Sequence, residues 1–301
     1  MNRNFTIAGV QMWVHENDLQ KNLKSMEDSV AFIAANYPFV DMIVFSELCM
    51  FGAPYPGWKR DAEPIPGPMT ERFCSLAGKH GKWLVPGSQY EKANGKIYNT
   101  SLAISPDGEI VARYRKMFPW QPLEQTEPGG DFCVFDVPDV GRFGLCICYD
   151  MWFPEVCRTL AWMGAEVIIH PTMTSTNDRE QELILARANA IFNQFYFIDV
   201  NGAGFGGNGR SLMADPHGRL LQSAGNEPLT MIETIDLERV RETREYGTAG
   251  VSQVLKQFVA TAVNYPVYGG DLAKGAGFMH LGAVSTPKRR NNDNKNLKEE
   301  E

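Results

Sequence analysis

The stretch Gly141-Arg-Phe-Gly-Leu-Cys-Ile-Cys-Tyr-Asp-Met-Trp-Phe-Pro-Glu155 carries an apolar run directly into a thiol and a turn. Apolar residues at positions 140, 143, 145 and 147 predict a buried strand, and Pro154 is suited to the first turn of a following helix. Cys148 therefore lies between the carboxyl end of a strand and a helix, where α/β folds usually place their chemistry. Backbone N–H groups at such a turn can meet an anion.

A cysteine at this place can also be an ordinary core residue, since cysteine is among the most buried residue types. We interpret Cys146, two positions earlier on the same strand, in that way, and Cys148 as a candidate nucleophile. The six cysteines, at positions 49, 74, 133, 146, 148 and 157, fit neither a small disulfide scaffold nor a zinc pattern. We therefore expect reduced thiols and no metal.

Composition bounds the class of protein. The chain has 301 residues, of which 44% are hydrophobic and 11% aromatic, which is ample for the core of one large or two smaller α/β domains. Its 29 basic and 36 acidic residues leave a net charge of -7, which favours neither a nucleic-acid nor an anionic-membrane partner. The apolar runs are of strand length and no signal peptide is recognisable, so we expect a cytoplasmic protein.

Strand and helix patterns alternate over much of the chain. Strands are predicted over 5–12, 40–45, 83–90, 165–170, 195–200 and 229–235, with hairpins pairing 98–105 with 109–115, 132–137 with 143–149, and 210–214 with 220–223. Helices are predicted from a cap at Asn17 or Asp18 to Pro38, over 70–80, over 154–163, from a cap at Asn177 to 194, and over 237–244. This mixture predicts a mixed α/β fold with two stacked sheets and outer helices.

Three reactive residues end separate predicted strands: Glu47, Lys116 and Cys148. Such ends can converge, and the three groups form a chemical set. A carboxylate can take the proton of a thiol, the sulfur can attack a carbonyl, and an ammonium can stabilise the developing oxyanion. Taken singly, however, a charged residue at a strand terminus is more often a solvated charge.

A Cys-His enzyme is the competing hypothesis, because imidazole is the common partner of a nucleophilic thiol. Of the five histidines, only His170 lies at the end of a predicted strand. Geometry rather than sequence position decides such pairs, so His170 stays an alternative at this point.

The motifs around these residues resemble those of the nitrilase, or carbon-nitrogen hydrolase, superfamily. The resemblance runs from about Phe5 to Arg244 and is carried by Phe45-Ser-Glu47, Tyr114-Arg-Lys116, Cys148-Tyr-Asp150 with Phe153-Pro-Glu155, Asn99-Thr-Ser101 and Asn201-Gly-Ala-Gly204. It implies a four-layer α-β-β-α sandwich. Since members of this family associate through further packing of such sandwiches, it also implies an even-numbered homo-oligomer, for which the apolar spacing in 250–268 is suited.

The resemblance also implies roles for residues. Glu47 would be the proton acceptor, Cys148 the nucleophile, and Lys116 with the backbone N–H of Tyr149 the oxyanion stabiliser. Glu124, in Lys116-Met-Phe-Pro-Trp-Gln-Pro-Leu-Glu124, matches a second glutamate of aliphatic amidases and formamidases that would orient the lysine and the substrate. Such a reaction needs neither metal nor cofactor.

The residues that follow the cysteine narrow the substrate class further than the thiol chemistry does. Tyr149-Asp150 follows the cysteine where nitrile hydrolysers of this superfamily usually carry Trp-Glu, so we expect a small linear amide. An N-carbamoyl amine or a nitrile is the alternative, followed by an acyltransferase that uses the same thioester and by a catalytically silent interaction module. Candidate substrate-binding residues are Tyr55, Trp120, Tyr149, Trp152 and Thr172.

Three regions are predicted along the chain: a carbon-nitrogen hydrolase domain over 1–247, a C-terminal extension over 248–288 that contributes to the oligomer interface, and a disordered tail over 289–301. The tail consists almost entirely of Arg, Asn, Asp, Lys and Glu, which cannot bury enough surface to become ordered. The sequence beyond Gly247 also differs from that expected of long-tailed formamidases, which weakens the case for formamide itself.

Overall fold

A computed structural model describes residues 3–52, 55–269, 275–276, 278–279 and 281–285. The chain divides into two compact units, one made of Met1–Pro119 with Thr126–Val263 and the other of Trp120–Gln125 with Asn264–Glu301. Each unit is described by itself below. The tail predicted over 289–301 lies outside the described residues.

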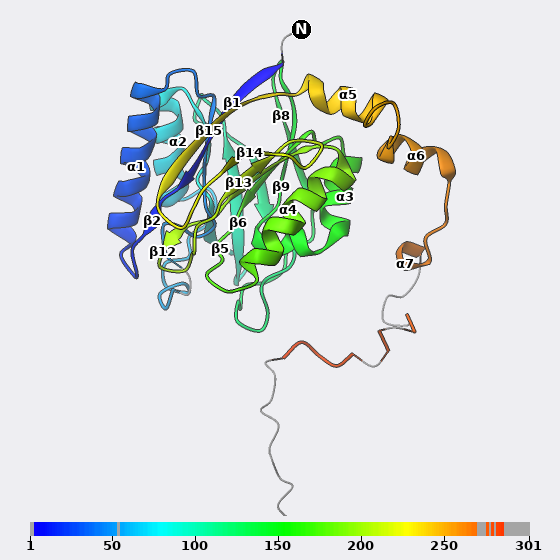
Figure 1. The fold of residues 1–301 in the computed structure, drawn as a ribbon. Helices are drawn as coiled ribbons and strands as arrows, with labels where there is room; N and C mark the ends of the chain where they lie inside the picture. Colours follow the sequence, from blue (N-terminus) through cyan, green and yellow to red (C-terminus); the bar gives the residue numbers. More distant parts are fainter. Residues whose placement is uncertain (1–2, 53–54, 270–274, 277, 280, 286–301) are drawn as a thin grey trace, which may run out of the picture. The chain divides into compact units, whose positions relative to one another are not determined.

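Two β-sheets form the centre of the larger unit (Figure 1). The first has the order β15-β1-β3-β4-β6-β5, with β7 also paired to β6, and the second has the order β14-β13-β11-β10-β9-β8. The first sheet contains β1 (Asn4–Gln11), β3 (Met42–Phe45), β4 (Trp83–Val85), β5 (Ser88–Ala93), β6 (Lys96–Ile104), β7 (Ile110–Arg115) and β15 (Leu229–Asp236). The second contains β8 (Cys133–Val137), β9 (Gly141–Leu145), β10 (Val167–Pro171), β11 (Tyr196–Val200), β13 (Leu212–Ala214) and β14 (Leu220–Ser223), while β2 (Trp13–Val14) pairs with β12 (Ala203–Gly204).

Helices cover the outer faces of both sheets. Helices α1 (Leu19–Asn36) and α2 (Pro68–His80) share one buried cluster with the first sheet, and α3 (Pro154–Trp162) and α4 (Arg179–Asn193) share another with the second. A third cluster lies between the two sheets and joins, for example, Ile7 of β1 to Phe143 of β9. Helices α5 (Glu238–Tyr246) and α6 (Val254–Thr261) follow, and α7 (Pro266–Gly269) belongs to the smaller unit. The predicted four-layer sandwich is confirmed.

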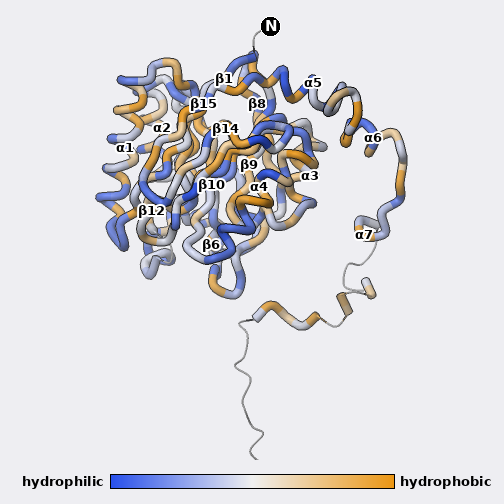
Figure 2. The backbone as a smooth tube through the Cα atoms, in the orientation of Figure 1, coloured by the Kyte–Doolittle hydropathy of each residue, from blue (hydrophilic) through white to orange (hydrophobic). Residues whose placement is uncertain are grey.

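Local sequence explains the helices. Asp18 caps α1 by accepting a hydrogen bond from the N–H of Lys21 at 3.1 Å, and the buried side chains of α1 repeat at helical spacing along one face. Helix α2 ends at Gly81, whose φ of 61° is the left-handed conformation that glycine favours. Figure 2 shows the result as hydrophobic and polar residues that alternate along α1.

Parallel strands at the centre of each sheet position the site. β3 runs parallel to β1 and β4, and β10 runs parallel to β9 and β11. Residues that follow these strands therefore come to the carboxyl edge of their sheet, as Glu47 does after β3 and Thr172 after β10.

The structure differs from the predicted strands in two places. The strand predicted over 83–90 is two strands, because the backbone turns at Gly87, where φ is 78° and a Cβ would lie 1.9 Å from the carbonyl oxygen of Ser46. The strand predicted over 143–149 ends at Leu145, and Cys148–Trp152 form the 3-10 turn η1. The first difference brings β4 and β5 against the segment that carries Glu47. The second makes Cys148 the first residue of a turn rather than part of a strand.

Two smaller differences concern helices. Helix α4 begins at Arg179 with Asp178 as its cap residue, one position after the predicted cap, and the apolar segment after 250 contains the helix α6. Within the described residues, none of the helices combines the length and the apolar character that crossing a membrane requires.

Candidate active site

Glu47 and Lys116 form a buried ion pair at the carboxyl edge of the first sheet. The side chains of Glu47 and Lys116 are 5% and 2% exposed, and Nζ of Lys116 lies 2.8 Å from Oε1 of Glu47. Asn99 on β6 donates a hydrogen bond from Nδ2 to the same oxygen at 2.8 Å, and its carbonyl accepts the backbone N–H of Lys116 at 2.8 Å. Asn99 therefore holds both members of the pair. The sequence placed Asn99 only in an accompanying motif and did not predict this contact.

Cys148 comes from the second sheet. It follows β9, begins η1, and has a φ of 49°, which is unusual for a residue with a side chain. Burial and then the Glu47 carboxylate raise the pKa of its thiol well above the ordinary value, while the Lys116 ammonium lowers it. Its surface is 8% exposed. The raised pKa favours the protonated thiol, and the thiol lies within electrostatic range of the Glu47–Lys116 pair of the other sheet.

Thr172 joins the two sheets beside this thiol. Its carbonyl accepts the backbone N–H of Glu47 at 3.2 Å, and its own N–H donates to the carbonyl of Val200 at 2.9 Å. The Thr172 side chain also interacts with the Cys148 thiol and lowers its pKa. Thr172, predicted as a lining residue, therefore lies at the thiol and helps to align the segment that carries Glu47.

Asp150 ties the lysine segment to the cysteine turn. Its buried carboxylate accepts hydrogen bonds from the Tyr114 hydroxyl at 2.7 Å, the Phe118 N–H at 2.9 Å and the Ile147 N–H at 2.9 Å. Burial raises the pKa of Asp150 to about 6, and Lys116 and these three donors limit the rise. The sequence showed Asp150 only as part of a motif; its positioning role depends on contacts between residues far apart in the chain.

His170 contacts Cys148, but through the cysteine backbone. Its Nε2 lies 3.0 Å from the carbonyl oxygen of Cys148, and its Nδ1 lies 2.7 Å from Oδ1 of Asp199. Because both ring nitrogens are used in these bonds, neither is free to take the thiol proton. This geometry disfavours the Cys-His alternative. Of the two carboxylates that raise the pKa of the thiol, Glu47 has the larger effect and Glu182 the smaller.

The predicted aromatic lining residues separate into two groups. Tyr149 and Trp152 lie in η1 with ring centroids 6.0 Å apart, and the indole Nε1 of Trp152 is buried without a hydrogen-bond partner among the described residues. Tyr55 instead packs against Phe51 at 5.3 Å in the cluster beneath α1 and α2, and its hydroxyl bonds to Asp61. The described contacts therefore bring Tyr149 and Trp152, but not Tyr55, to the cysteine turn.

Glu124 and Trp120 belong to the smaller unit. Within that unit, Oε2 of Glu124 accepts the backbone N–H of Trp120 at 2.8 Å, and the Glu124 N–H donates to the Trp120 carbonyl at 2.9 Å. These two residues thus form one short turn. Their roles toward Lys116 and the substrate stay predictions.

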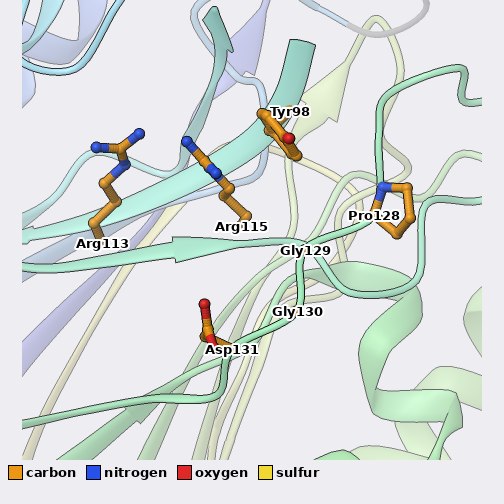
Figure 3. A pocket seen from close by; sticks show the side chains of 7 residues that line it. All are labelled: Tyr98, Arg113, Arg115, Pro128, Gly129, Gly130 and Asp131. Carbon is orange, nitrogen blue, oxygen red and sulfur yellow. The ribbon is translucent and has the colours of Figure 1, made fainter. Parts of the chain in front are cut away.

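The pocket shown in Figure 3 lies elsewhere in the larger unit. It is lined by Tyr98, Arg113, Arg115, Pro128, Gly129, Gly130 and Asp131. None of these is a predicted site residue, and both arginines are paired with the buried carboxylate of Glu91. Among the described residues, no group of three or more His, Cys, Asp or Glu side chains is arranged to hold a metal ion. The ion pair and thiol at the sheet edges are therefore the candidate site.

Comparison with known proteins agrees with this geometry. The model of the carbon-nitrogen hydrolase family matches residues 6–245. A formamidase of Bacillus cereus strain AH820 is 34% identical over 196 residues, which are 63% of this chain and 58% of the formamidase, and a formamidase of Bacillus anthracis matches equally. The match thus spans less than two thirds of these relatives.

Solved structures share the fold. Nit3 of Saccharomyces cerevisiae, a member of branch 10 of the nitrilase superfamily, superimposes with a TM-score of 0.75 at 26% identity and covers 83% of this chain and 96% of Nit3. An amidase of Nesterenkonia AN1 shows the same fold with a TM-score of 0.71 at 23% identity over 81% of this chain and 95% of the amidase. Since the family model covers most of the chain, this protein belongs to the carbon-nitrogen hydrolase family of the nitrilase superfamily.

Proposed function

We propose that the protein hydrolyses a non-peptide C–N bond of a small linear amide to a carboxylate and ammonia through a thioester on Cys148. The observation that carries this proposal is the buried Glu47–Lys116 ion pair, whose two charges act on the pKa of the Cys148 thiol. The 34% identity to formamidases supports an amide as the substrate class.

In the acylation half-reaction, Glu47 takes the thiol proton as sulfur attacks the carbonyl carbon. The carbonyl π electrons move to oxygen, where the Lys116 ammonium and the backbone N–H of Tyr149 stabilise the negative charge. Glu47 then returns the proton to the nitrogen as the C–N bond breaks, and ammonia leaves. The starting thiol is protonated because burial and Glu47 raise its pKa, so a nearby base is required.

In the deacylation half-reaction, Glu47 takes a proton from water, whose oxygen attacks the thioester carbon. The C–S bond breaks, Glu47 passes the proton that it took from water to the sulfur, and the carboxylic acid product loses its own proton to solvent and leaves as a carboxylate. Glu124 is proposed to position Lys116 and the amide, and Trp120, Tyr149, Trp152 and Thr172 to contact the substrate. We further propose that the enzyme is cytoplasmic and acts as an even-numbered homo-oligomer.

Ammonia release from a panel of substrates tests the proposal. The panel contains formamide, acetamide and propionamide, together with N-carbamoyl amines and short nitriles. We expect release from at least one amide and a matching acyl adduct on the peptide that contains Cys148. Transfer of the acyl group to hydroxylamine at the expense of hydrolysis would identify an acyltransferase instead. Ammonia release only from N-carbamoyl amines or only from nitriles would show that those compounds, and not amides, are the substrates. Absence of ammonia from every compound would overturn the proposal.

A further inference from the structure

The environment of His170 determines its protonation. Its two ring nitrogens face the carbonyl oxygen of Cys148 at 3.0 Å and the carboxylate of Asp199 at 2.7 Å, and His170 is fully buried. A carbonyl has no proton to give. Burial raises the pKa of Asp199, but Arg179, which donates from Nη2 to its carboxylate, and His170 outweigh burial and lower it, so Asp199 is ionised. Both ring nitrogens must therefore donate. A neutral imidazole carries only one N–H, so these contacts require an imidazolium.

Charge balance agrees with this assignment. Arg179 bonds to Asp199 and, at 3.1 Å, to Glu182, whose other oxygen accepts from the Thr174 hydroxyl at 3.0 Å. With His170 protonated, two cations and two anions share this buried space. Burial lowers the pKa of His170, but Asp199, the Cys148 carbonyl and Glu182 outweigh burial, and the net direction is upward. Loss of the proton would leave an uncompensated buried negative charge, which is costly.

The Cys148 carbonyl belongs to the same peptide group as the N–H of Tyr149. A trans peptide is planar, so its C=O and N–H point in opposite directions. The carbonyl points to His170, and the N–H of Tyr149 therefore points away from His170. Because Cys148 has a φ of 49°, this peptide is held in a conformation that depends on such fixed contacts.

We infer that His170 is a positioning residue, a buried imidazolium that holds the Cys148–Tyr149 peptide so that its N–H faces the reacting carbonyl. The assignment of that N–H to the oxyanion rests on the proposed function. A hydrogen bond from a cation to the carbonyl also polarises the peptide and makes its N–H a stronger donor. His170 thus acts on the reaction through the backbone, without touching the substrate.

Nitrogen-15 NMR of the histidine rings tests the protonation. The protein is labelled at its histidines, and the spectrum of a His170→Gln variant assigns the His170 signals. At about pH 7, above the ordinary histidine value of 6.5, we expect both ring nitrogens of His170 to give the signals of protonated nitrogen. A signal from an unprotonated ring nitrogen at that pH would overturn the inference, and this test does not depend on amide turnover.

Two substitutions test the positioning. The amide nitrogen of His170→Gln can reproduce the donor to the Cys148 carbonyl, whereas that of His170→Asn can reproduce only the donor to Asp199. Both variants lose the cation, so a purely structural role predicts equal losses. Gln194→Met is the matched control. Gln194 also donates from a buried side chain to a backbone carbonyl, that of Thr243 at 2.9 Å, but it lies between α4 and β11 and not at the cysteine turn.

We expect amide turnover about tenfold higher in His170→Gln than in His170→Asn, because only the former keeps the oxyanion donor aligned. Alkylation of Cys148 by iodoacetamide forms no oxyanion and should differ far less between the two. Equal turnover in both variants would overturn the inference. Should the wild type hydrolyse no amide, the backbone nitrogen-15 shift of Tyr149 gives the result: displacement in His170→Asn but not in His170→Gln supports the inference, and no displacement in either overturns it.

Discussion

Two buried sets of charges flank the cysteine turn, one from each sheet, and they differ in what surrounds them. Glu47 and Lys116 of the first sheet act on the Cys148 thiol and shift its pKa in opposite directions. Beside the second sheet, Asp199 of β11 contacts both Arg179 of α4 and His170 of β10, and each of these two cations also donates to a backbone carbonyl. A base must gain and lose a proton during a reaction, whereas a support must not. We therefore propose that the charges of the first sheet supply proton transfer and that those beside the second sheet supply position.

The largest expected effect comes from removing the thiol that the two sets share. Cys148→Ala should abolish turnover with the fold intact, because the nucleophile is lost. Cys146→Ala should retain most activity, since Cys146 is a core residue whose thiol contacts that of Cys157. Ammonia release and mass spectrometry of the acyl adduct compare the two variants. Unchanged ammonia release in both would show that neither cysteine is the nucleophile.

The next largest effect is expected from Glu47, the group proposed to transfer the proton. Glu47→Gln keeps the shape of the side chain but removes the base and the partner of Lys116, so it should lose both half-reactions. General acid–base assistance is commonly worth about a hundred- to ten-thousand-fold in rate, and we expect a loss in that range. Mass spectrometry after mixing with substrate measures it. Rapid acyl-enzyme formation in this variant would mean that another group activates the thiol.

Glu124→Gln is the control glutamate for that experiment. If Glu124 positions the lysine and the amide, this variant should turn over slowly while Cys148 can still be alkylated by a small reagent. Thiol reactivity therefore separates a positioning glutamate from the base. Equal loss of acylation and alkylation in both variants would contradict the division of roles.

A smaller effect concerns Asp150, which connects the two sheets. Asparagine would place its NH2 group against one or more of the three donors that the carboxylate now accepts, so Asp150→Asn should destabilise the fold by about 1–3 kcal/mol. The pKa of Asp150 is raised from 3.8 to about 6, so its protonation adds stability that is fully present below 3.8 and is lost as the pH rises through about 6. The difference in unfolding free energy between wild type and variant should therefore be larger at low pH. A difference independent of pH would contradict the raised pKa.

The sequence predicted the parts of this molecule that depend on local pattern. Hydrophobic periodicity and caps indicated the two stacked sheets and outer helices, and the motifs placed Glu47, Lys116 and Cys148 at strand ends that converge. It did not predict the break at Gly87 or the contacts of Asp150, His170 and Arg179. These depend on which atoms approach from distant segments, and the sequence does not show which donor an aspartate will accept from or which acceptor a histidine will donate to.

The smallest expected effect lies away from both charge sets, on the surface that we propose for self-association. Helix α6 leaves Val259 67% exposed, and Val251, which precedes the helix, is 63% exposed. Exposed apolar side chains that gather on one surface are typical of an interaction site. We expect an even-numbered homo-oligomer by light scattering at micromolar concentration. Val259→Lys should weaken association because it places a charge in the contact, and removal of residues 289–301 should change neither association nor turnover. Turnover per subunit should fall little, because the Glu47–Lys116 pair and the His170 contacts are complete within one chain. A monomeric wild type would rule out this surface as an interface, and loss of turnover in step with dissociation would show that a second subunit completes the site.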